Sequence, residues 1–280
     1  MRNDEYISET KLILVKTILF LGQKTFIGRG QIRKKMVDFI NYLIGYGNMH
    51  TSRFICKVNN VPFHFYNDRY TGIKFYFGKN ENKEIEFIKK NSPNNSVFID
   101  IGSNMGLYTQ NIAYLNNKHR KIKIISIDAN PINILRLNKN LKLLTKKIPK
   151  IFSMIKVKNY ALGNRNTKLN FDFSRGLANG CISKKIKKKD NITVYCKKLI
   201  NVVKEEKLNS ITNLKIDIEG YEDKVLIPFF KSCNKQLYPK NIILEHSSKN
   251  LWEKDLIKFI YSIGYKKVFI NNANLILSLK

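Results

Sequence analysis

The sequence predicts an α/β protein with a Rossmann-like, mostly parallel sheet and an antiparallel hairpin at the C-terminal end. Short apolar runs alternate with segments of helical spacing from about residue 96 onward, which is the pattern of a parallel sheet with crossover helices. The last two β-rich runs, 267–270 and 275–279, have only Asn271–Asn274 between them and therefore predict the hairpin. A chain of 280 residues with 43% hydrophobic residues can bury the core of one such domain and a modest extra segment.

Residues 1–80 are predicted to be a separate lead-in to the main domain at 81–280. The pattern from 8 to 44 is helical, with an interruption at Gly28–Gly30. Three short β-rich runs follow and predict a small antiparallel sheet, at 54–58, 61–66 and 73–77.

In the main domain, strands and helices are expected to alternate. The predicted strands are 97–101, 122–128, 155–160, 168–173, a run beginning at 194, 214–217 and 241–245. The predicted helices are 81–90, a segment after Gly106, 133–144, a segment ending near 207, 222–231 and 251–263. The lysine cluster 184–189 lies in a run of weak periodicity, for which a mobile surface loop is expected.

The net charge of +30 would favour nucleic acid or an anionic membrane as partner. Only 9 of the 51 basic residues are arginine, however, and this lysine excess is typical of an AT-rich coding sequence. Proteins that read base sequence use arginine for bidentate contacts. Nucleic-acid binding is therefore possible but not favoured.

The four cysteines lie far apart and form no C-x-x-C pair, so they predict neither a zinc site nor a disulfide framework. A reducing cytoplasm fits this pattern best. The apolar run 12–21 is broken by Lys16 and is shorter than the ~20 residues that a membrane span needs. We expect this helix to pack on its own domain, with peripheral membrane contact as the alternative.

The first candidate site is the loop Asp100-x-Gly102-x-Asn104-x-Gly106, which follows a buried strand and precedes a helix. Missing side chains in such a loop let a ligand approach the backbone at the carboxyl end of the strand. A dinucleotide site would place more glycine here, and Asp100 would repel a pyrophosphate. An adenosine ligand that carries positive charge and no phosphate, such as S-adenosylmethionine, fits better. Asp128, at the end of the next strand, can accept hydrogen bonds from the ribose hydroxyls.

Two further groups of polar residues end predicted strands. Asp217 and Glu219 alternate with apolar residues, so both carboxylates leave the strand end on one side. Such a pair can deprotonate a hydroxyl, bind a divalent metal or position a substrate, although no metal site is predicted. Glu222 fits either a functional role or a helix N-terminus equally well. Glu245 and His246 follow the next strand, and histidine is suited to proton transfer near neutral pH.

Taken in order, these segments resemble the FkbM family of S-adenosylmethionine-dependent methyltransferases from about Glu84 to Tyr265. The matching pieces are Val97–Thr109, Ile127–Pro131, Asn159–Gly163, Leu214–Glu222 and Ile242–Glu245. Two positions depart from the family pattern, namely Asp128-Ala129 in place of Glu-Pro and Tyr221 in place of alanine. The first keeps an acid that can reach a ribose, and the second lies on the substrate side.

The resemblance implies the seven-stranded methyltransferase fold and methyl transfer to oxygen. It also implies that Asp100, Gly102, Asn104 and Gly106 line the methionine half of the cofactor, that Asp128 binds the ribose and that Tyr160 and Ala161 border the adenine. The adjacent Ser103 and Ala129, together with Asp217, complete the predicted cofactor-binding set.

The predicted function is an O-methyltransferase acting on a hydroxyl of a sugar, glycan or related small molecule. Glu219 or Glu245 is the expected general base, with His246 in reserve. Two alternatives remain. One is an RNA or protein methyltransferase that uses the basic surface, and the other is a non-catalytic binding module of the same fold.

Overall fold

The computed structural model describes residues 7–24, 30–46, 52–67, 73–77, 81–116, 121–172, 181–182 and 191–280. The chain divides into two compact units, Met1–Asn82 and Lys83–Lys280. Within the described ranges, no helix is both long enough and apolar enough to cross a membrane.

The first unit contains two helices, a β-hairpin and a 3-10 helix. The helices are α1 (Glu9–Lys24) and α2 (Gly30–Ile44), and the strands are β1 (Phe54–Val58) and β2 (Val61–Phe65). Asn59 and Asn60 join the two strands, both with positive φ (52° and 67°). Two successive positive φ angles define the two-residue turn whose twist matches that of antiparallel strands, and asparagine tolerates this conformation.

The predicted third strand at 73–77 is wrong, because these residues form the 3-10 helix η2 (Ile73–Phe77). The adjacent side chains of Tyr76 and Phe77 are both buried, whereas a strand would bury alternate positions. The Tyr76 hydroxyl accepts a hydrogen bond from the Tyr66 backbone N–H (2.8 Å) and donates one to the His64 carbonyl (3.0 Å). These contacts hold the segment across the end of the hairpin and prevent it from extending the sheet.

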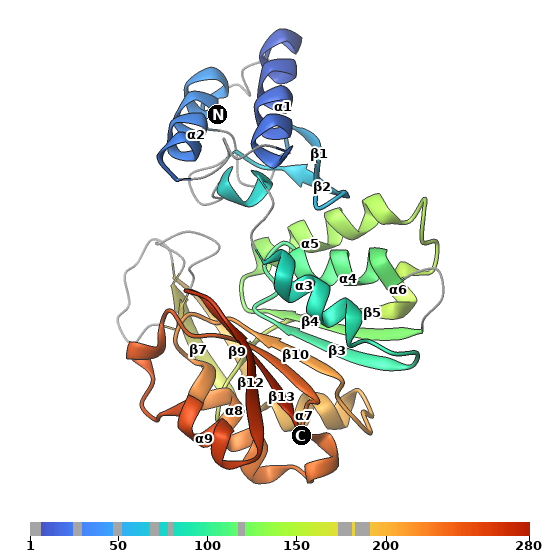
Figure 1. Cartoon of the computed structure of the whole chain (residues 1–280), viewed down its shortest axis with the longest axis vertical. Helices are drawn as coiled ribbons and strands as arrows, with labels where there is room; N and C mark the ends of the chain where they lie inside the picture. The colour runs from blue at the N-terminus through green and yellow to red at the C-terminus, as the bar shows by residue number, and fades with distance from the viewer. Residues whose placement is uncertain are drawn as a thin grey trace. The chain divides into compact units, whose positions relative to one another are not determined.

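The second unit is built on a seven-stranded sheet (Figure 1). In spatial order its strands are β12 (Tyr265–Ile270), β13 (Asn274–Leu279), β11 (Asn241–Glu245), β10 (Asn213–Ile216), β3 (Ser96–Ile101), β4 (Ile122–Asp128) and β5 (Ile155–Asn159). The five strands from β11 to β5 pair in parallel, while β13 is antiparallel to both β11 and β12. This arrangement confirms the predicted mostly parallel sheet and its antiparallel C-terminal hairpin.

Helices cover both faces of this sheet (Figure 1). One face carries α3 (Asn82–Lys90), α4 (Leu107–Asn116), α5 (Pro131–Leu144) and α6 (Ile151–Met154). The other carries α7 (Leu199–Glu205), α8 (Glu222–Ser232) and α9 (Leu256–Ser262). The central strands are buried on both sides and consist mainly of isoleucine, leucine and phenylalanine, as expected for parallel strands.

The order of the strands places the glycine loop where ligands bind in open α/β sheets. From β3 the chain runs outward through β4 to β5, and it then returns to β10 on the other side of β3. The direction of winding therefore reverses at β3, and ligands bind at the carboxyl ends of the strands beside such a switch point. The loop 102–106 follows β3 directly at this position.

The strands predicted near 168–173 and 194 are present as β7 (Thr167–Asp172) and β9 (Asn191–Lys197). They form a second sheet with β6 (Ala161–Leu162) and β8 (Cys181–Ile182), a pairing that the sequence pattern did not predict. The lysine cluster 184–189 lies outside the described residues. The helix predicted at 251–263 begins only at Leu256, because the Asp255 carboxylate caps it by accepting from the Lys258 N–H (2.9 Å).

Candidate active site

The glycine loop has a conformation that requires glycine at two positions. Gly102 and Gly106 have φ angles of 74° and 98°. A Cβ atom on Gly102 would lie 1.8 Å from the Asp217 carbonyl oxygen, and one on Gly106 would lie 2.4 Å from Leu137 Cδ1. The loop after β3 therefore touches the chain that leaves β10, and this close approach excludes any side chain.

All five backbone N–H groups of this loop donate to acceptors within the chain. Those of Gly102 and Ser103 donate to the Ile127 carbonyl (2.9 and 3.1 Å), and that of Gly106 donates to the Ser103 carbonyl (2.9 Å). The N–H of Asn104 donates to Asp128 Oδ2 (2.7 Å), and that of Met105 to Asn104 Oδ1 (2.8 Å). A pyrophosphate site needs such groups to point at the ligand. The loop therefore suits a nucleoside ligand without phosphates.

Asp100 is fully buried on β3 and only partly satisfied. Its Oδ2 accepts hydrogen bonds from the backbone N–H (3.2 Å) and hydroxyl (2.6 Å) of Thr109. Its Oδ1 has no hydrogen-bond partner in the described part of the chain. Burial raises the pKa of this carboxyl, while the nearby Lys215 charge and the Thr109 bonds act in the opposite direction. A buried carboxylate oxygen without a donor fits a ligand that brings a donor or a positive charge.

Asp128 ends β4 and ties the glycine loop to the next helix. Besides Asn104, it accepts hydrogen bonds at Oδ1 from the Asn130 N–H (2.8 Å) and the Asn133 side-chain amide (3.2 Å). Burial raises the pKa of Asp128 to about 6, although the hydrogen bonds that Asp128 accepts act to lower this pKa. Each carboxylate oxygen can accept about two hydrogen bonds, so Oδ2 keeps capacity for a ligand hydroxyl.

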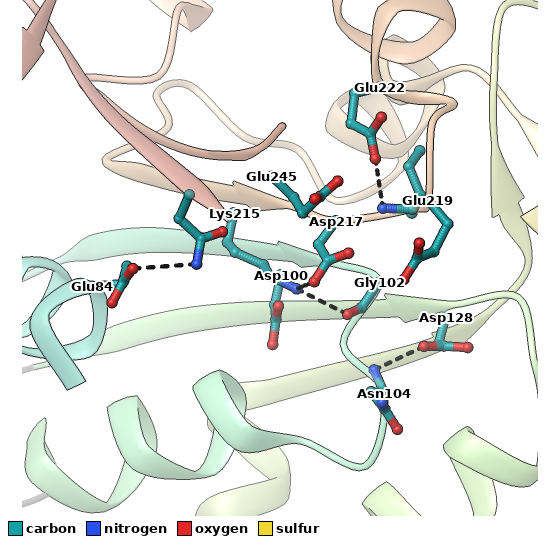
Figure 2. A network of polar contacts seen from close by, with 12 residues as sticks. Glu84, Asp100, Gly102, Asn104, Asp128, Lys215, Asp217, Glu219, Glu222 and Glu245 are labelled. Carbon is teal, nitrogen blue, oxygen red and sulfur yellow. Dashed lines mark hydrogen bonds and ion pairs between the residues drawn. The ribbon is translucent and has the colours of Figure 1, made fainter. Parts of the chain in front are cut away.

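Lys215 on β10 places a buried ammonium beside these acids (Figure 2). Its Nζ donates to the Gly102 carbonyl (3.1 Å) and pairs with Asp217 Oδ2 (3.3 Å). It also lies 5.3 Å from the centre of the Tyr108 ring. Lys215 was not among the residues selected from the sequence. A charged residue inside an otherwise apolar strand was the one signal that could have selected it.

Glu219 and Glu245 extend from the ends of β10 and β11 into the same region (Figure 2). Burial, and then the negative charges of Asp217 and Glu245, raise the pKa of Glu219 to about 7. The Ser248 hydroxyl donates to Glu219 Oε2 (3.3 Å). Glu245 is buried, with Oε1 accepting from the Ser247 N–H (2.6 Å) and hydroxyl, while Oε2 has no partner in the described part of the chain.

Glu222 shapes the loop that carries Glu219. Its buried carboxylate accepts hydrogen bonds from the N–H groups of Ile218 (2.8 Å) and Gly220 (3.1 Å) and from the Trp252 indole (2.7 Å). Between these two bonded residues, Glu219 has a positive φ of 56°, which is uncommon for a residue with a side chain. Of the two alternatives left open by the sequence, these contacts support the one in which Glu222 satisfies free N–H groups at a helix N-terminus, and they also hold the loop that carries Glu219.

The remaining predicted residues lie around this centre. His246 Nε2 is 3.0 Å from the Asn271 carbonyl, so its ring interacts with the C-terminal hairpin. Ser103 and Tyr160 are buried, and their hydroxyls have no hydrogen-bond partner within the described ranges. Ala161 and Ala129 belong to one apolar cluster.

No group of three or more histidine, cysteine, aspartate or glutamate side chains that could hold a metal ion occurs among the residues that the structure describes.

The fold and this site define an S-adenosylmethionine-dependent methyltransferase. The sheet order, the glycine loop that excludes phosphate and the acid at the end of β4 form the expected setting for that donor. A model of the methyltransferase FkbM domain matches residues 100–267, which is more than half of the chain. The chain therefore belongs to the FkbM methyltransferase family, and the predicted resemblance is confirmed.

Solved structures with a similar fold are distant in sequence. A putative rRNA-methylase from Clostridium thermocellum is 9% identical over 71% of this chain and 94% of that chain, with a TM-score of 0.41. TYW2 of M. jannaschii, solved in complex with AdoMet, is 13% identical over 84% of this chain and 88% of that chain, with a TM-score of 0.43. Similarities at this level carry no argument about the acceptor. No curated protein sequence matches the chain significantly.

Proposed function

We propose that this methyltransferase acts on a hydroxyl group of a sugar, glycan or related small molecule, with Glu219 as the general base. The observation that carries the proposal is the position of the half-buried Glu219 carboxyl group beside Asp217 and Glu245 at the carboxyl edge of the sheet (Figure 2). Burial and these neighbouring charges raise the pKa of Glu219 to about 7. A base with a pKa near the working pH combines a useful ionised fraction with sufficient basicity. The acceptor class comes from the family resemblance.

The residues of the site have separate tasks in this proposal. The donor, when bound, supplies an electrophilic methyl group on a sulfonium. Asp100 and Asp128 hold its positively charged and ribose portions, and this fit is supported by the Oδ1 of buried Asp100, which has no partner among the described residues. Glu219 orients the acceptor hydroxyl and takes up its proton at a carboxylate oxygen. Much of the acceleration is expected from this positioning of reactants.

Two measurements test the proposal together. The protein is titrated calorimetrically with S-adenosylmethionine, and release of S-adenosylhomocysteine is then followed with a panel of sugars and glycans. Binding of the donor and release that depends on a hydroxylated acceptor would support the proposal. Absence of donor binding would refute it and favour a binding module that has lost its chemistry.

The rate is expected to increase with pH through a midpoint near 7. Because protonated Glu219 cannot accept a proton, the active fraction should rise from about one tenth at pH 6 to about nine tenths at pH 8. The measurement is kcat/KM between pH 5.5 and 9. His246→Gln is the matched control, because histidine also titrates in this range. Loss of the pH dependence in that variant would assign the base to His246.

Asp128→Asn is expected to weaken S-adenosylmethionine binding about tenfold or more, with a smaller effect on kcat. The amide keeps the size of the side chain but removes the charge and one acceptor that face Asn104 and the predicted ribose position. Calorimetric titration measures the change. Asp172→Asn, on β7 in the other sheet, is the control.

Action on RNA is the second candidate, and the net charge of +30 is the observation that favours it. A mixed oligonucleotide should then bind with an affinity that falls steeply with salt. We expect no measurable binding at about 0.15 M salt, because the lysine excess fits compositional bias. Tight binding with a steep salt dependence would instead favour a nucleic-acid acceptor.

A further inference from the structure

The ion pair between Lys215 and Asp217 lies at the point where the glycine loop meets β10. Lys215 pairs in register with Asp100 on the neighbouring strand, so both side chains leave the same face of the sheet. The Lys215 side chain is 5% exposed, and that of Asp217 is 31% exposed. The positive member of the pair is thus buried, while the negative member faces the region where ligands bind.

Burying an ammonium is costly unless the surroundings compensate. Here the Gly102 carbonyl, Asp217 and the face of the Tyr108 ring contribute to the compensation, and the negative charges of Asp100 and Asp128 interact with Lys215 as well. The lysine thus places a positive charge at the glycine loop, where a negatively charged group of a ligand can use it.

The methyl donor has the complementary chemistry. S-adenosylmethionine carries an ammonium and a carboxylate on the same carbon atom, so one positive and one negative group that lie side by side can bind both. Lys215 Nζ and Asp217 Oδ2 are 3.3 Å apart and offer one positive and one negative group at that spacing (Figure 2). The neighbouring Asp100, Glu219 and Glu245 are acids and can serve only the positive parts of the donor.

We propose that the Lys215–Asp217 pair recognises the amino-acid end of the donor, with Lys215 binding its carboxylate and Asp217 its ammonium. This inference rests on the proposed use of S-adenosylmethionine and assigns Lys215 a binding role. The ammonium has three N–H groups, and a ligand carboxylate would replace the long contact to Asp217 as partner of one of them.

The decisive probe is decarboxylated S-adenosylmethionine, which keeps the sulfonium, the ammonium and the adenosine but lacks the carboxylate. Calorimetric titrations compare both donors in the wild-type protein and in Lys215→Met. We expect the variant to bind S-adenosylmethionine about 10- to 100-fold more weakly, which is the range for a lost charge-assisted hydrogen bond. Its affinity for the decarboxylated donor should stay within about threefold of wild type, because Asp217 remains available for the ammonium.

Two control variants make the result specific. Lys215→Arg keeps the charge and should preserve most of the preference for the intact donor. Lys156→Met removes an exposed lysine of the same sheet and should change neither affinity.

Three outcomes would contradict the expectation. Equal weakening of the binding of both donors in Lys215→Met would show a structural role for Lys215 and overturn the inference. Equal affinity of the wild-type protein for both donors would overturn it without any variant. Failure of the wild-type protein to bind either donor would instead refute the proposed function itself.

Discussion

Glu219→Gln is expected to reduce kcat about 10²- to 10⁴-fold while S-adenosylmethionine binds within about threefold of wild-type affinity. The amide has nearly the shape of the carboxyl group and can keep the contact with the Ser248 hydroxyl, but it cannot accept the acceptor's proton. The substitution also removes the repulsion between the Glu219 carboxylate and the negative charges of Asp217 and Glu245. Single-turnover assays and calorimetric titration measure the two effects separately.

Two matched variants show whether the loss belongs to Glu219. Glu253→Gln removes a carboxylate that pairs with Lys224 and is 63% exposed, and it should leave turnover unchanged. Glu245→Gln tests the other predicted base. If Glu245→Gln lost turnover while Glu219→Gln kept it, the general base would be Glu245 and the proposed role of Glu219 would be wrong.

The grouping of the residues on the predicted cofactor side could be inferred from the sequence because its signals are local. Asp100, Gly102 and Gly106 lie within seven residues at the carboxyl end of one apolar strand, and Asp128 ends the next strand. Parallel strands bring their carboxyl ends to one edge, so correct strand ends place these residues together. The structure has Asp128 bonded to the Asn104 N–H, which joins the two motifs directly.

The acceptor side could not be predicted to the same depth because its contacts are long-range. The Glu222 carboxylate that holds the Glu219 loop also accepts from the Trp252 indole, 30 residues later, and His246 interacts with Asn271, 25 residues away. The positive φ of Glu219 also has no sequence signal, since a glutamate normally avoids it.

The errors in the fold have the same origin. The run 73–77 has strand-forming residues, but the Tyr76 hydroxyl contacts to Tyr66 and His64 override that local preference. The β7 strand was predicted, but its pairing with β9 in a second sheet was not, because the paired residues lie 19 to 29 positions apart in the sequence. Local patterns therefore identify elements better than they identify the sheet to which each element belongs.

Gly102→Ala is expected to destabilise the second unit by about 3 kcal/mol or more and to abolish measurable S-adenosylmethionine binding. The new Cβ would lie 1.8 Å from the Asp217 carbonyl oxygen, and a backbone atom cannot move aside as a flexible side chain can. The loop or the end of β10 must then shift, which also displaces the Gly102 carbonyl from Lys215. Chemical denaturation and calorimetric titration measure the two consequences.

Gly264→Ala is the matched control because it separates collision from backbone strain. Gly264 also has a positive φ, of 102°, but its nearest neighbour would be Leu279 Cδ1 at 3.6 Å, an ordinary contact. Its substitution should cost only the strain of a left-handed residue, about 1–2 kcal/mol, and leave donor affinity unchanged. Equal effects of the two substitutions would mean that strain alone explains the loss and that the close approach between the glycine loop and β10 does not hold the site together. A larger effect at Gly102, accompanied by loss of donor binding, would establish that this contact aligns the cofactor residues on β3 with the proposed base and positioning residues that follow β10.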